Sequence, residues 1–284
     1  MRARVVEVGT GHAGVLDWGG SGPPLVLLHP NGFCAGLYEP VARRLVDRAR
    51  VIGIDLPGHG MSSTPPARES YEFPAMARYV LAVLDRLGID RAAVVGGSLG
   101  GAVAVLAGAM EPGRWHRALL AEPVAYPAPP EAAASPNPMA AVARRRRRRF
   151  PDRSAMVAAL ARREPLSQLA PEALDAYARW GTVEVDGEVA LACDPEVEAT
   201  IFEISGEPQG ARSAWECLPR LSCPTTVVAG RSSFLPDVFA EQAARAGAGL
   251  VVVPGGHFVL HEDTDRGARL IARYALAPAG PAPR

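Results

Sequence analysis

The sequence predicts an α/β protein with a mostly parallel central sheet that helices cover on both faces. Short, continuous apolar runs such as residues 25–28 and 51–54 alternate along the chain with longer segments of helical periodicity. Unbroken apolar runs are typical of parallel strands, because both faces of such strands are buried. The chain has 284 residues, 48% of them hydrophobic, which is enough to bury a large core. Strands that alternate with helices therefore indicate a single α/β sheet.

The N-terminal part of the chain supplies the first strands and helices. Four apolar segments before residue 60 are predicted as strands: 5–8, 14–18, 25–28 and 51–54. Between the last two, Leu37, Val41 and Leu45 recur on one face of a predicted helix. A second helix is predicted from about residue 73 to residue 87, because Gly88 then supplies a stop signal.

Residues 92–107 combine a strand, a tight turn and a helix. The apolar run ends at two glycines, Ser98 follows, and after two more glycines the chain continues as an alanine-rich helix. A serine at such a turn sits in strained backbone at the carboxyl end of a sheet, with its hydroxyl exposed. Small residues at Gly96 and Gly100 let the strand and the helix approach closely. The turn therefore predicts Ser98 as a nucleophile.

The rest of the chain contains an interruption of the strand and helix pattern. A short apolar strand is followed by six prolines between residues 123 and 138, which predict a linker. Residues 139–180 are helical and basic in pattern, and residues 183–191 predict a hairpin with an Asp-Gly turn. The remaining predicted elements are strands at 118–121, 224–230 and 250–253, helices at 236–246 and 266–276, and a disordered tail at 278–284.

Three motifs match those of a known family. Residues 29–32 read His-Pro-Asn-Gly, residues 55–62 read Asp-Leu-Pro-Gly-His-Gly-Met-Ser, and residues 96–100 read Gly-Gly-Ser-Leu-Gly. They correspond to the oxyanion loop, the Asp-x-x-Gly-x-Gly-x-Ser turn and the nucleophile elbow of the α/β-hydrolase fold superfamily, with Pro30 in place of the usual glycine. The chain thus resembles a serine hydrolase with a lid insertion.

The resemblance implies a division of the chain and an oxyanion hole. The hydrolase core falls at residues 1–122 and 216–284, and a linker and helical lid fall at 123–215. The two oxyanion donors fall on the main-chain N–H groups of Asn31 and Leu99. Such donors stabilise the negative charge that develops on the substrate oxygen in the transition state. An alternative role for the Asn31 side chain is to cap the following helix.

The resemblance also implies a base and an acid for Ser98. The base is His257, on the loop directly after the last predicted strand, with His261 as the alternative. The family usually carries its acid in the turn after the strand at 226–229, but that turn holds no carboxylate here. Some members place the acid after the preceding core strand, where this chain has Glu122. The remaining alternatives are Asp237, whose charge also suits the start of a predicted helix, and no acid in contact with the histidine.

Composition argues against several function classes. Thirty basic and thirty acidic residues leave a net charge of zero, so no global field favours nucleic acid or an anionic membrane. The four cysteines lack the spacing of metal or disulfide motifs and are expected to be reduced thiols of a cytoplasmic protein. The N-terminal residues predict neither a signal peptide nor a membrane span. We therefore expect no metal, no cofactor and a small-molecule substrate, while the oligomeric state is not indicated.

Residues 144–149 are six consecutive arginines. On a regular helix they occupy every side, so either some of them point inward or the segment is not a regular helix. The run is either an anion clamp over the active-site mouth or a solvated part of the lid. The candidate substrate contacts are Arg145 and Arg148 from this run and Phe33 from the loop after the first buried strand.

Together these residues predict acyl-serine chemistry. The expected reaction is hydrolysis of an ester, thioester or lactone of a small molecule. One alternative is non-hydrolytic chemistry on the same fold, such as acyl transfer, cyclisation or C–C cleavage. A second is a catalytically inert, ligand-binding member of the family, and the missing aspartate of the usual turn is its only support.

Overall fold

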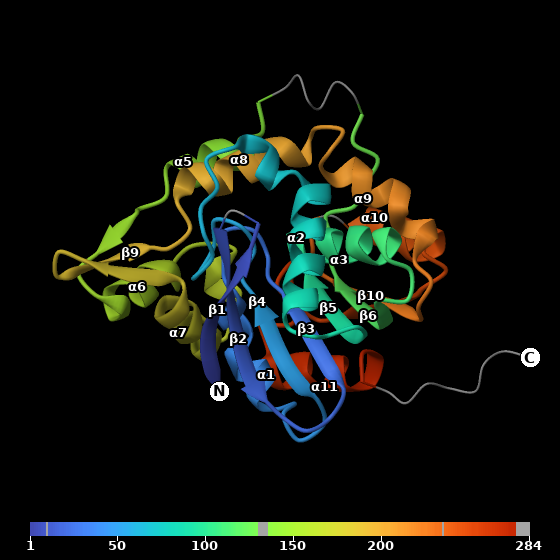
Figure 1. Cartoon of the computed structure of the whole chain (residues 1–284). Coiled ribbons are helices and arrows are strands. Elements are labelled where there is room, and N and C mark those ends of the chain that lie inside the picture. The colour runs from blue at the N-terminus through green and yellow to red at the C-terminus, as the bar shows by residue number, and fades with distance from the viewer. Residues whose placement is uncertain (10, 130–135, 235, 277–284) are drawn as a thin grey trace, which may run out of the picture.

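The computed structural model describes the chain except residues 10, 130–135, 235 and 277–284 (Figure 1). It confirms the predicted fold class, because an eight-stranded and mostly parallel sheet lies between layers of helices. The tail predicted at 278–284 lies outside the described residues. No helix in the described part combines the length and the apolar character needed to cross a membrane.

The central sheet has the strand order β1-β2-β4-β3-β5-β6-β10-β11. β1 pairs with β2 and β2 with β4 in antiparallel fashion, and the other neighbours are parallel. The strands are β1 (Arg2–Val8), β2 (Gly11–Gly19), β3 (Pro24–Leu28), β4 (Arg50–Ile54), β5 (Ala92–Gly97), β6 (Trp115–Ala121), β10 (Thr225–Gly230) and β11 (Gly249–Val253). Each coincides with a predicted strand. Because β5, β6 and β10 are parallel neighbours, the residues that follow them meet at one edge of the sheet.

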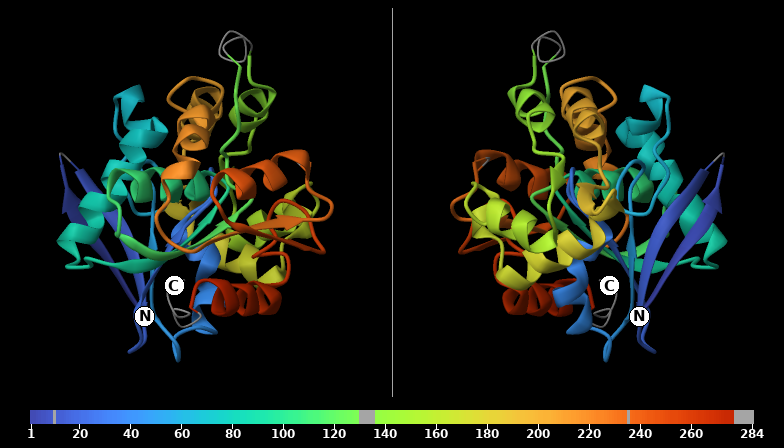
Figure 2. Two further views of the ribbon diagram at one scale, coloured as in Figure 1. Left: turned by 90° about the vertical axis from the view of Figure 1, so that its right-hand side faces the viewer. Right: turned by 90° about the vertical axis from the view of Figure 1, so that its left-hand side faces the viewer.

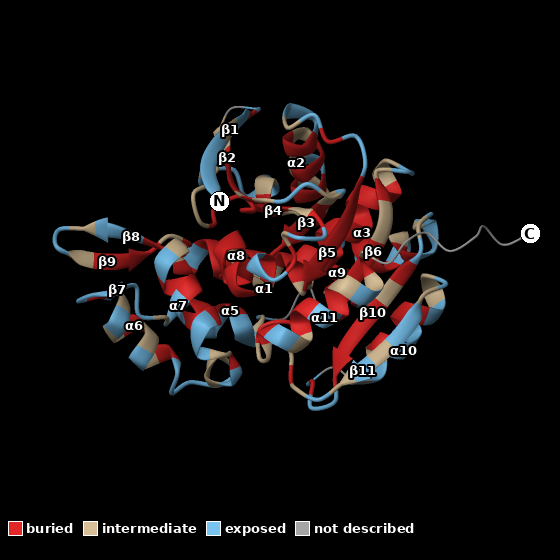
Figure 3. Cartoon of the chain, turned by 90° about the horizontal axis from the view of Figure 1, so that it is seen from below, coloured by how far each residue is buried: buried red, intermediate tan, exposed pale blue. Residues whose placement is uncertain are grey.

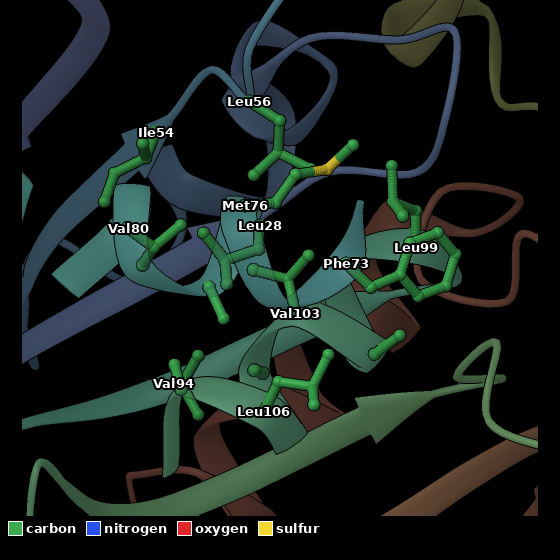
Figure 4. Close-up of a cluster of buried hydrophobic side chains, with 14 of the residues drawn as sticks. Leu28, Ile54, Leu56, Phe73, Met76, Val80, Val94, Leu99, Val103 and Leu106 are labelled. Carbon is green, nitrogen blue, oxygen red and sulfur yellow. The ribbon is translucent and has the colours of Figure 1, made fainter. Parts of the chain in front are cut away.

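Helices cover both faces of this sheet. Leu28 and Val94 point to the face covered by α2 (Phe73–Arg86), α3 (Leu99–Met110), α9 (Ala211–Cys217) and α10 (Pro236–Arg245), as Figure 4 shows for the first two helices. Leu27 and Val95 point to the opposite face, under α1 (Glu39–Arg43) and α11 (Thr264–Tyr274). β5 is buried along its whole length (Figure 3). Burial of each such side chain contributes roughly 1.5–3 kcal/mol to stability, which explains the continuous apolar runs.

The helix predicted around Leu37, Val41 and Leu45 is shorter than expected. A 3₁₀ turn spans Ala35–Tyr38, α1 follows it, and Leu45 lies beyond the end of α1. All three side chains are nevertheless buried. The break has a local cause, because a continuous helix needs the N–H of residue 40 for the carbonyl four residues earlier, and Pro40 has none.

Residues 123–215, predicted as linker and lid, leave the central sheet after β6 and return at β10. The described part of the segment contains α5 (Pro138–Arg144), β7 (Arg149–Phe150), α6 (Arg153–Leu160), α7 (Pro171–Trp180), β8 (Thr182–Val185), β9 (Glu188–Leu191), α8 (Pro195–Ser205) and α9. α5 lies beside α8 (Figures 1 and 2). β8 and β9 form the predicted hairpin, and its Asp186 and Gly187 have φ of 55° and 81°, as a type I′ turn requires.

The segment departs from its predicted pattern in three places, one of which is α9, where no helix is predicted. α5 ends at Arg144, and the last arginine of the run, Arg149, lies in β7, which pairs with β9. The run is therefore not a regular helix, in which like charges at neighbouring turns repel. The third departure is α8, where no helix is predicted either. Its signal is local, because Asp194 caps the helix and Pro195 is its first residue.

Candidate active site

Ser98 lies at the sharp turn between β5 and α3. Its φ of 52° and ψ of −115° are unusual for a residue other than glycine, and such a conformation costs on the order of 1–3 kcal/mol. Main-chain hydrogen bonds hold the turn, because the Ser98 N–H donates to the carbonyl of Ala121 at 2.9 Å and the Val124 N–H donates to the carbonyl of Ser98 at 3.1 Å. Ser98 is only half-buried. The turn predicted from the glycine-rich motif is therefore present.

Close packing at this turn depends on Gly96 and Gly100. A β-carbon on Gly96 would lie 2.4 Å from the carbonyl oxygen of Gly100, and one on Gly100 would lie 2.2 Å from the carbonyl oxygen of Leu28. Both distances are far below van der Waals contact. A side chain at either position would force the helix away from the sheet, which confirms the reason for predicting small residues there.

His257 joins Ser98 to Glu122. The His257 Nε2 lies 3.0 Å from the Ser98 Oγ, and the Nδ1 lies 2.6 Å from the Glu122 Oε2. An ionised carboxylate only accepts hydrogen bonds, so the Nδ1 carries the proton that it donates to Glu122. The Nε2 is then free to accept the proton of the Ser98 hydroxyl. The contacts predicted for His257 on both sides are present.

Glu122 is 1% exposed, and both of its carboxylate oxygens accept hydrogen bonds. Its Oε1 accepts from the Gly230 N–H at 2.7 Å, and its Oε2 accepts from the Ser233 Oγ at 2.8 Å as well as from His257. Gly230 ends β10 and Ser233 lies in the turn that follows, where the family usually carries its acid. In this chain that turn supplies hydrogen-bond donors to a carboxylate on the neighbouring strand.

The alternative acid, Asp237, has no hydrogen bond to His257 in the described part of the chain. It lies exposed in the first turn of α10, where its charge complements the helix dipole. Glu122 already holds the Nδ1 of His257. The geometry is therefore against Asp237 as the residue that orients the imidazole.

Asn31 and Leu99 both line the cavity that contains Ser98. Leu99 is the first residue of α3, so its N–H has no partner within the helix. The N–H of Asn31 donates to no other described residue. Two such donors beside a nucleophile are what an oxyanion hole needs. The Asn31 side chain does not cap the following helix, because its Nδ2 donates to the carbonyl of Glu198, across the loop, at 3.0 Å.

Two neutral histidines hold residues 29–32, which we call the oxyanion loop. His29 donates from Nδ1 to the carbonyl of Pro30 at 2.8 Å, and its Nε2 accepts from a main-chain N–H at 3.0 Å. His59 accepts at Nε2 from the Gly32 N–H at 3.1 Å. Burial lowers the pKa of His59 to about 4 and holds the pKa of His29 well below its ordinary value. Both rings therefore stay neutral and support the loop.

A buried ion pair ties the oxyanion loop to the segment above it. Arg146 pairs with Glu198 and donates to the Tyr177 hydroxyl at 2.9 Å. The Tyr177 hydroxyl in turn donates to the carbonyl of Gly32 at 2.9 Å, and Glu198 accepts from Asn31 through its main-chain carbonyl. One arginine of the run thus points inward and helps to fix the backbone that carries the Asn31 donor.

The cavity at Ser98 has a volume of about 280 Å³ and mostly apolar walls. Its apolar lining residues include Phe73, Leu99, Val124, Met139, Ile201, Phe202, Phe234 and Phe258. Apolar walls around a few polar groups are typical of small-molecule sites.

Several of these lining residues are not among the predicted contacts. The Phe234 ring lies 4.9 Å from the His257 ring, and Phe234, a residue that is 65% exposed, lines the cavity. Phe202 and Ile201 come from α8, for which no helix is predicted. Phe258 directly follows His257, so its position next to the base was available from the sequence.

His261, the alternative base, is a core residue. It is 1% exposed, and its ring packs edge-on against Tyr38 with 4.5 Å between the ring centroids. Neither ring nitrogen has a hydrogen-bond partner in the part of the protein that the structure describes. Burial lowers the pKa of His261 to about 3. The ring that faces the Ser98 hydroxyl is that of His257.

We expect the buried His261 to make folding sensitive to acid. The unfolded chain binds a proton near the ordinary histidine pKa of 6.5, whereas the folded chain binds it only near pH 3. Below pH 6.5 proton uptake by His261 therefore favours the unfolded chain. This uptake lowers the free energy of unfolding by about 1.4 kcal/mol at pH 5.5. Between pH 7.5 and 5.5 the free energy of unfolding in urea should fall by about 1.4 kcal/mol less in His261→Leu than in the wild type. An equal fall in both proteins would contradict this account.

Two of the three candidate substrate contacts line a cavity. Phe33 and Arg145 line a second cavity beside the first. Arg148 lines neither of these two cavities, and its guanidinium pairs with Asp194 at 2.8 Å. The geometry thus gives no support to Arg148 as a substrate contact, which stays a prediction, because its guanidinium pairs with a carboxylate outside both cavities.

Known proteins of similar sequence and structure include hydrolases. The chain is 39% identical over 98 residues to the pimeloyl-[acyl-carrier protein] methyl ester esterase of Methylococcus capsulatus, a stretch that covers 34% of this chain and 36% of the esterase. It is also 39% identical over 98 residues to the dihydrolipoyllysine-residue acetyltransferase component of the acetoin cleaving system of Pseudomonas putida, covering 34% of this chain and 25% of that protein. The matched stretches thus span well under two thirds of these relatives.

Solved structures match over nearly the whole chain. E-2-(acetamidomethylene)succinate hydrolase superposes with a TM-score of 0.81 at 25% identity, covering 96% of this chain and 98% of that one. The thioesterase domain from the curacin biosynthetic pathway gives the same TM-score and identity, covering 95% of this chain and 99% of that one. A family model described as alpha/beta hydrolase fold matches residues 23–264. The chain therefore belongs to the α/β-hydrolase fold family, as the three motifs imply.

Proposed function

We propose that the chain is a serine hydrolase that cleaves an ester, thioester or lactone of a small molecule through an acyl-serine intermediate. One observation carries the proposal: the unbroken contact from Glu122 through His257 to Ser98, with distances of 2.6 Å and 3.0 Å. A serine beside a base that a carboxylate orients is an activated nucleophile. The esterase and thioesterase among the similar proteins support this class of reaction.

The proposed mechanism uses each of these side chains in turn. The Ser98 Oγ attacks the carbonyl carbon while His257 Nε2 takes the hydroxyl proton. The oxygen that becomes negative accepts hydrogen bonds from the N–H groups of Asn31 and Leu99, and one such donor typically supplies about 3–4 kcal/mol to the transition state. The tetrahedral intermediate collapses, and His257 gives its proton to the departing alcohol or thiol. Water, deprotonated by His257, then attacks the acyl carbon, and as the second tetrahedral intermediate collapses His257 returns the proton to the Ser98 Oγ and the acid is released.

We also propose that residues 123–215 act as the lid of this site. α5 and α8 supply Met139, Ile201 and Phe202 to the apolar wall of the cavity. Such a cover excludes water from the acyl group and strengthens the oxyanion hydrogen bonds. The buried pair of Arg146 and Glu198 joins this cover to the oxyanion loop.

The inert, ligand-binding alternative rests on the missing aspartate of the turn after β10. Because Glu122 makes the contact that this aspartate makes elsewhere in the family, the departure no longer favours a site without an acid. The non-hydrolytic alternatives use the same residues and differ in what attacks the acyl-serine.

Trapping of the acyl-enzyme tests the proposal. The protein is mixed with 4-nitrophenyl butyrate, quenched in acid within the first turnovers and measured by intact mass, and the modified peptide is then sequenced. We expect a mass increase of one butyryl group on Ser98, which decays as butyric acid forms. Product formation without an adduct would exclude acyl-serine chemistry. A protein that shows no turnover and is not labelled by a fluorophosphonate would favour the inert alternative. Transfer of the acyl group to an added alcohol or amine in preference to water would favour acyl transfer.

A further inference from the structure

The second cavity adjoins the cavity at Ser98 and has a volume of about 370 Å³. The two cavities share the lining residues Asn31, Met139, Pro165, Phe202 and Phe258. A substrate whose carbonyl lies at Ser98 can therefore extend past Asn31 into the second cavity. The second cavity differs in its chemistry, because its walls include four arginines: Arg145, Arg146, Arg147 and Arg163.

The arginines of the run that do not line this cavity are all neutralised by carboxylates of the same segment. Arg144 pairs with Glu196 and Glu203, Arg148 with Asp194, and Arg149 with Asp186 and Glu188. Among the arginines in the cavity wall, Arg146 pairs with Glu198. Within the described chain, no carboxylate forms an ion pair with Arg145, Arg147 or Arg163. Within the run of residues 144–149, the two arginines left without a carboxylate, Arg145 and Arg147, thus both line the second cavity.

The charge of the cavity wall is positive. Its four guanidinium groups outnumber its two carboxylates, those of Glu164 and Glu198. Arg147 is held against the wall by its stacking on Phe150, with 4.8 Å from the guanidinium carbon to the ring centroid. A planar guanidinium beside apolar surface is well suited to bind a carboxylate or phosphate through two parallel hydrogen bonds.

We propose that the second cavity is an anion subsite, which binds a carboxylate or phosphate group that the substrate of Ser98 carries at some distance from its reacting carbonyl. The proposal rests on the serine hydrolase function proposed above. Arg145 follows α5 and Arg163 follows α6, and both line the cavity, so two guanidinium groups from different parts of the segment are available to the anion. The apolar residues between the two sites, Phe202 and Phe258 among them, contact the chain that links the carbonyl to the anion.

Matched substrates test the subsite and identify the source of the anion. In the acyl arm, monomethyl suberate is compared with methyl octanoate, which lacks the terminal carboxylate. In the leaving-group arm, octanoyl-coenzyme A is compared with octanoyl-N-acetylcysteamine, which lacks the phosphates. The variants are Arg145→Ala, Arg163→Ala and their combination. The matched controls are Arg148→Ala, in the same run, and Arg162→Ala, beside Arg163 but not in the cavity wall.

In one arm we expect the wild type to have a higher kcat/KM for the anionic substrate than for its neutral match. The double variant should lower this ratio by about tenfold or more, mainly by raising the KM of the anionic substrate. The two control variants should retain the preference, and Arg145→Lys should restore part of it. The arm that responds tells whether the anion belongs to the acyl group or to the leaving group. If neutral substrates are cleaved but neither preference changes in the double variant, the anion subsite is excluded while the hydrolase function stands.

A binding measurement keeps the two proposals separate. Monomethyl suberate and octanoyl-coenzyme A are titrated calorimetrically into the Ser98→Ala variant, with and without the two arginine substitutions. A roughly tenfold weaker affinity without the arginines supports the subsite even if no ester is hydrolysed. If each ligand binds Ser98→Ala equally well with and without the two arginine substitutions, the subsite is overturned, whatever the catalytic activity of the wild type.

Discussion

Replacement of Ser98 by alanine is expected to lower kcat by a factor on the order of 10⁶, the scale seen when the nucleophile of a comparable serine, histidine and carboxylate site is removed. The oxyanion donors and the cavity remain, but no hydroxyl is left for His257 to activate. The fold should survive, because the Ser98 main-chain hydrogen bonds do not involve the lost oxygen. Initial rates on 4-nitrophenyl butyrate and the thermal midpoint of unfolding measure the two effects.

Ser232→Ala is the matched control for this substitution. Ser232 is exposed in the turn after β10, and its N–H donates to the carbonyl of Gly255 without help from the side chain. The control should keep the wild-type rate. A Ser98→Ala protein that is folded and hydrolyses the ester at the wild-type rate would rule out Ser98 as the nucleophile.

The parts of the site that could be predicted from the sequence are those fixed by local geometry. The turn at Ser98 requires glycines on both sides, because Gly96 and Gly100 lie too close to neighbouring backbone to carry side chains. The strand before this turn, β5, and its neighbours β3 and β6 lie inside the sheet, and burial on both faces gives such strands continuous apolar runs. Once β5, β6 and β11 are ordered in a parallel sheet, the residues that follow them meet at one edge. The resemblance to the α/β-hydrolase family implied Glu122 and His257 there, with Asp237 and His261 as alternatives, and in the structure the first two side chains lie in contact beside Ser98.

The parts that could not be predicted depend on partners distant in the sequence. Nothing near Arg146 or Arg148 in the chain tells that Glu198 and Asp194 neutralise them, and so the run looked uniform. The Asn31 side chain likewise bonds to Glu198, 167 residues away, instead of the adjacent helix. Which side chains pair in this way depends on how the segment 123–215 packs on the rest of the chain. The hydrophobic periodicity of the sequence predicts helices and strands but not this tertiary packing.

Replacement of Glu122 by glutamine is expected to place the wrong tautomer of His257 next to Ser98. The Gly230 N–H needs an acceptor, so the glutamine oxygen takes the position of Oε1 and its NH₂ group takes the position of Oε2. That NH₂ group then donates to the Nδ1 of His257 and moves the ring proton to the Nε2, where it faces Ser98. The ring loses its ability to accept the serine proton, and the charge that stabilises the imidazolium is gone as well.

We expect this change to lower kcat by about 10⁴, as the equivalent loss of a triad carboxylate does in serine proteases, while KM changes little. Asp237→Asn is the matched control, since it removes the charge of the rival carboxylate. It should leave kcat unchanged and cost no more than roughly 0.3–1 kcal/mol in the free energy of unfolding, because Asp237 is an exposed residue at the start of α10. Rates at saturating ester and urea unfolding of the three proteins decide the point. A large loss of kcat in Asp237→Asn together with an active Glu122→Gln would transfer the orienting role to Asp237 and refute the site proposed here.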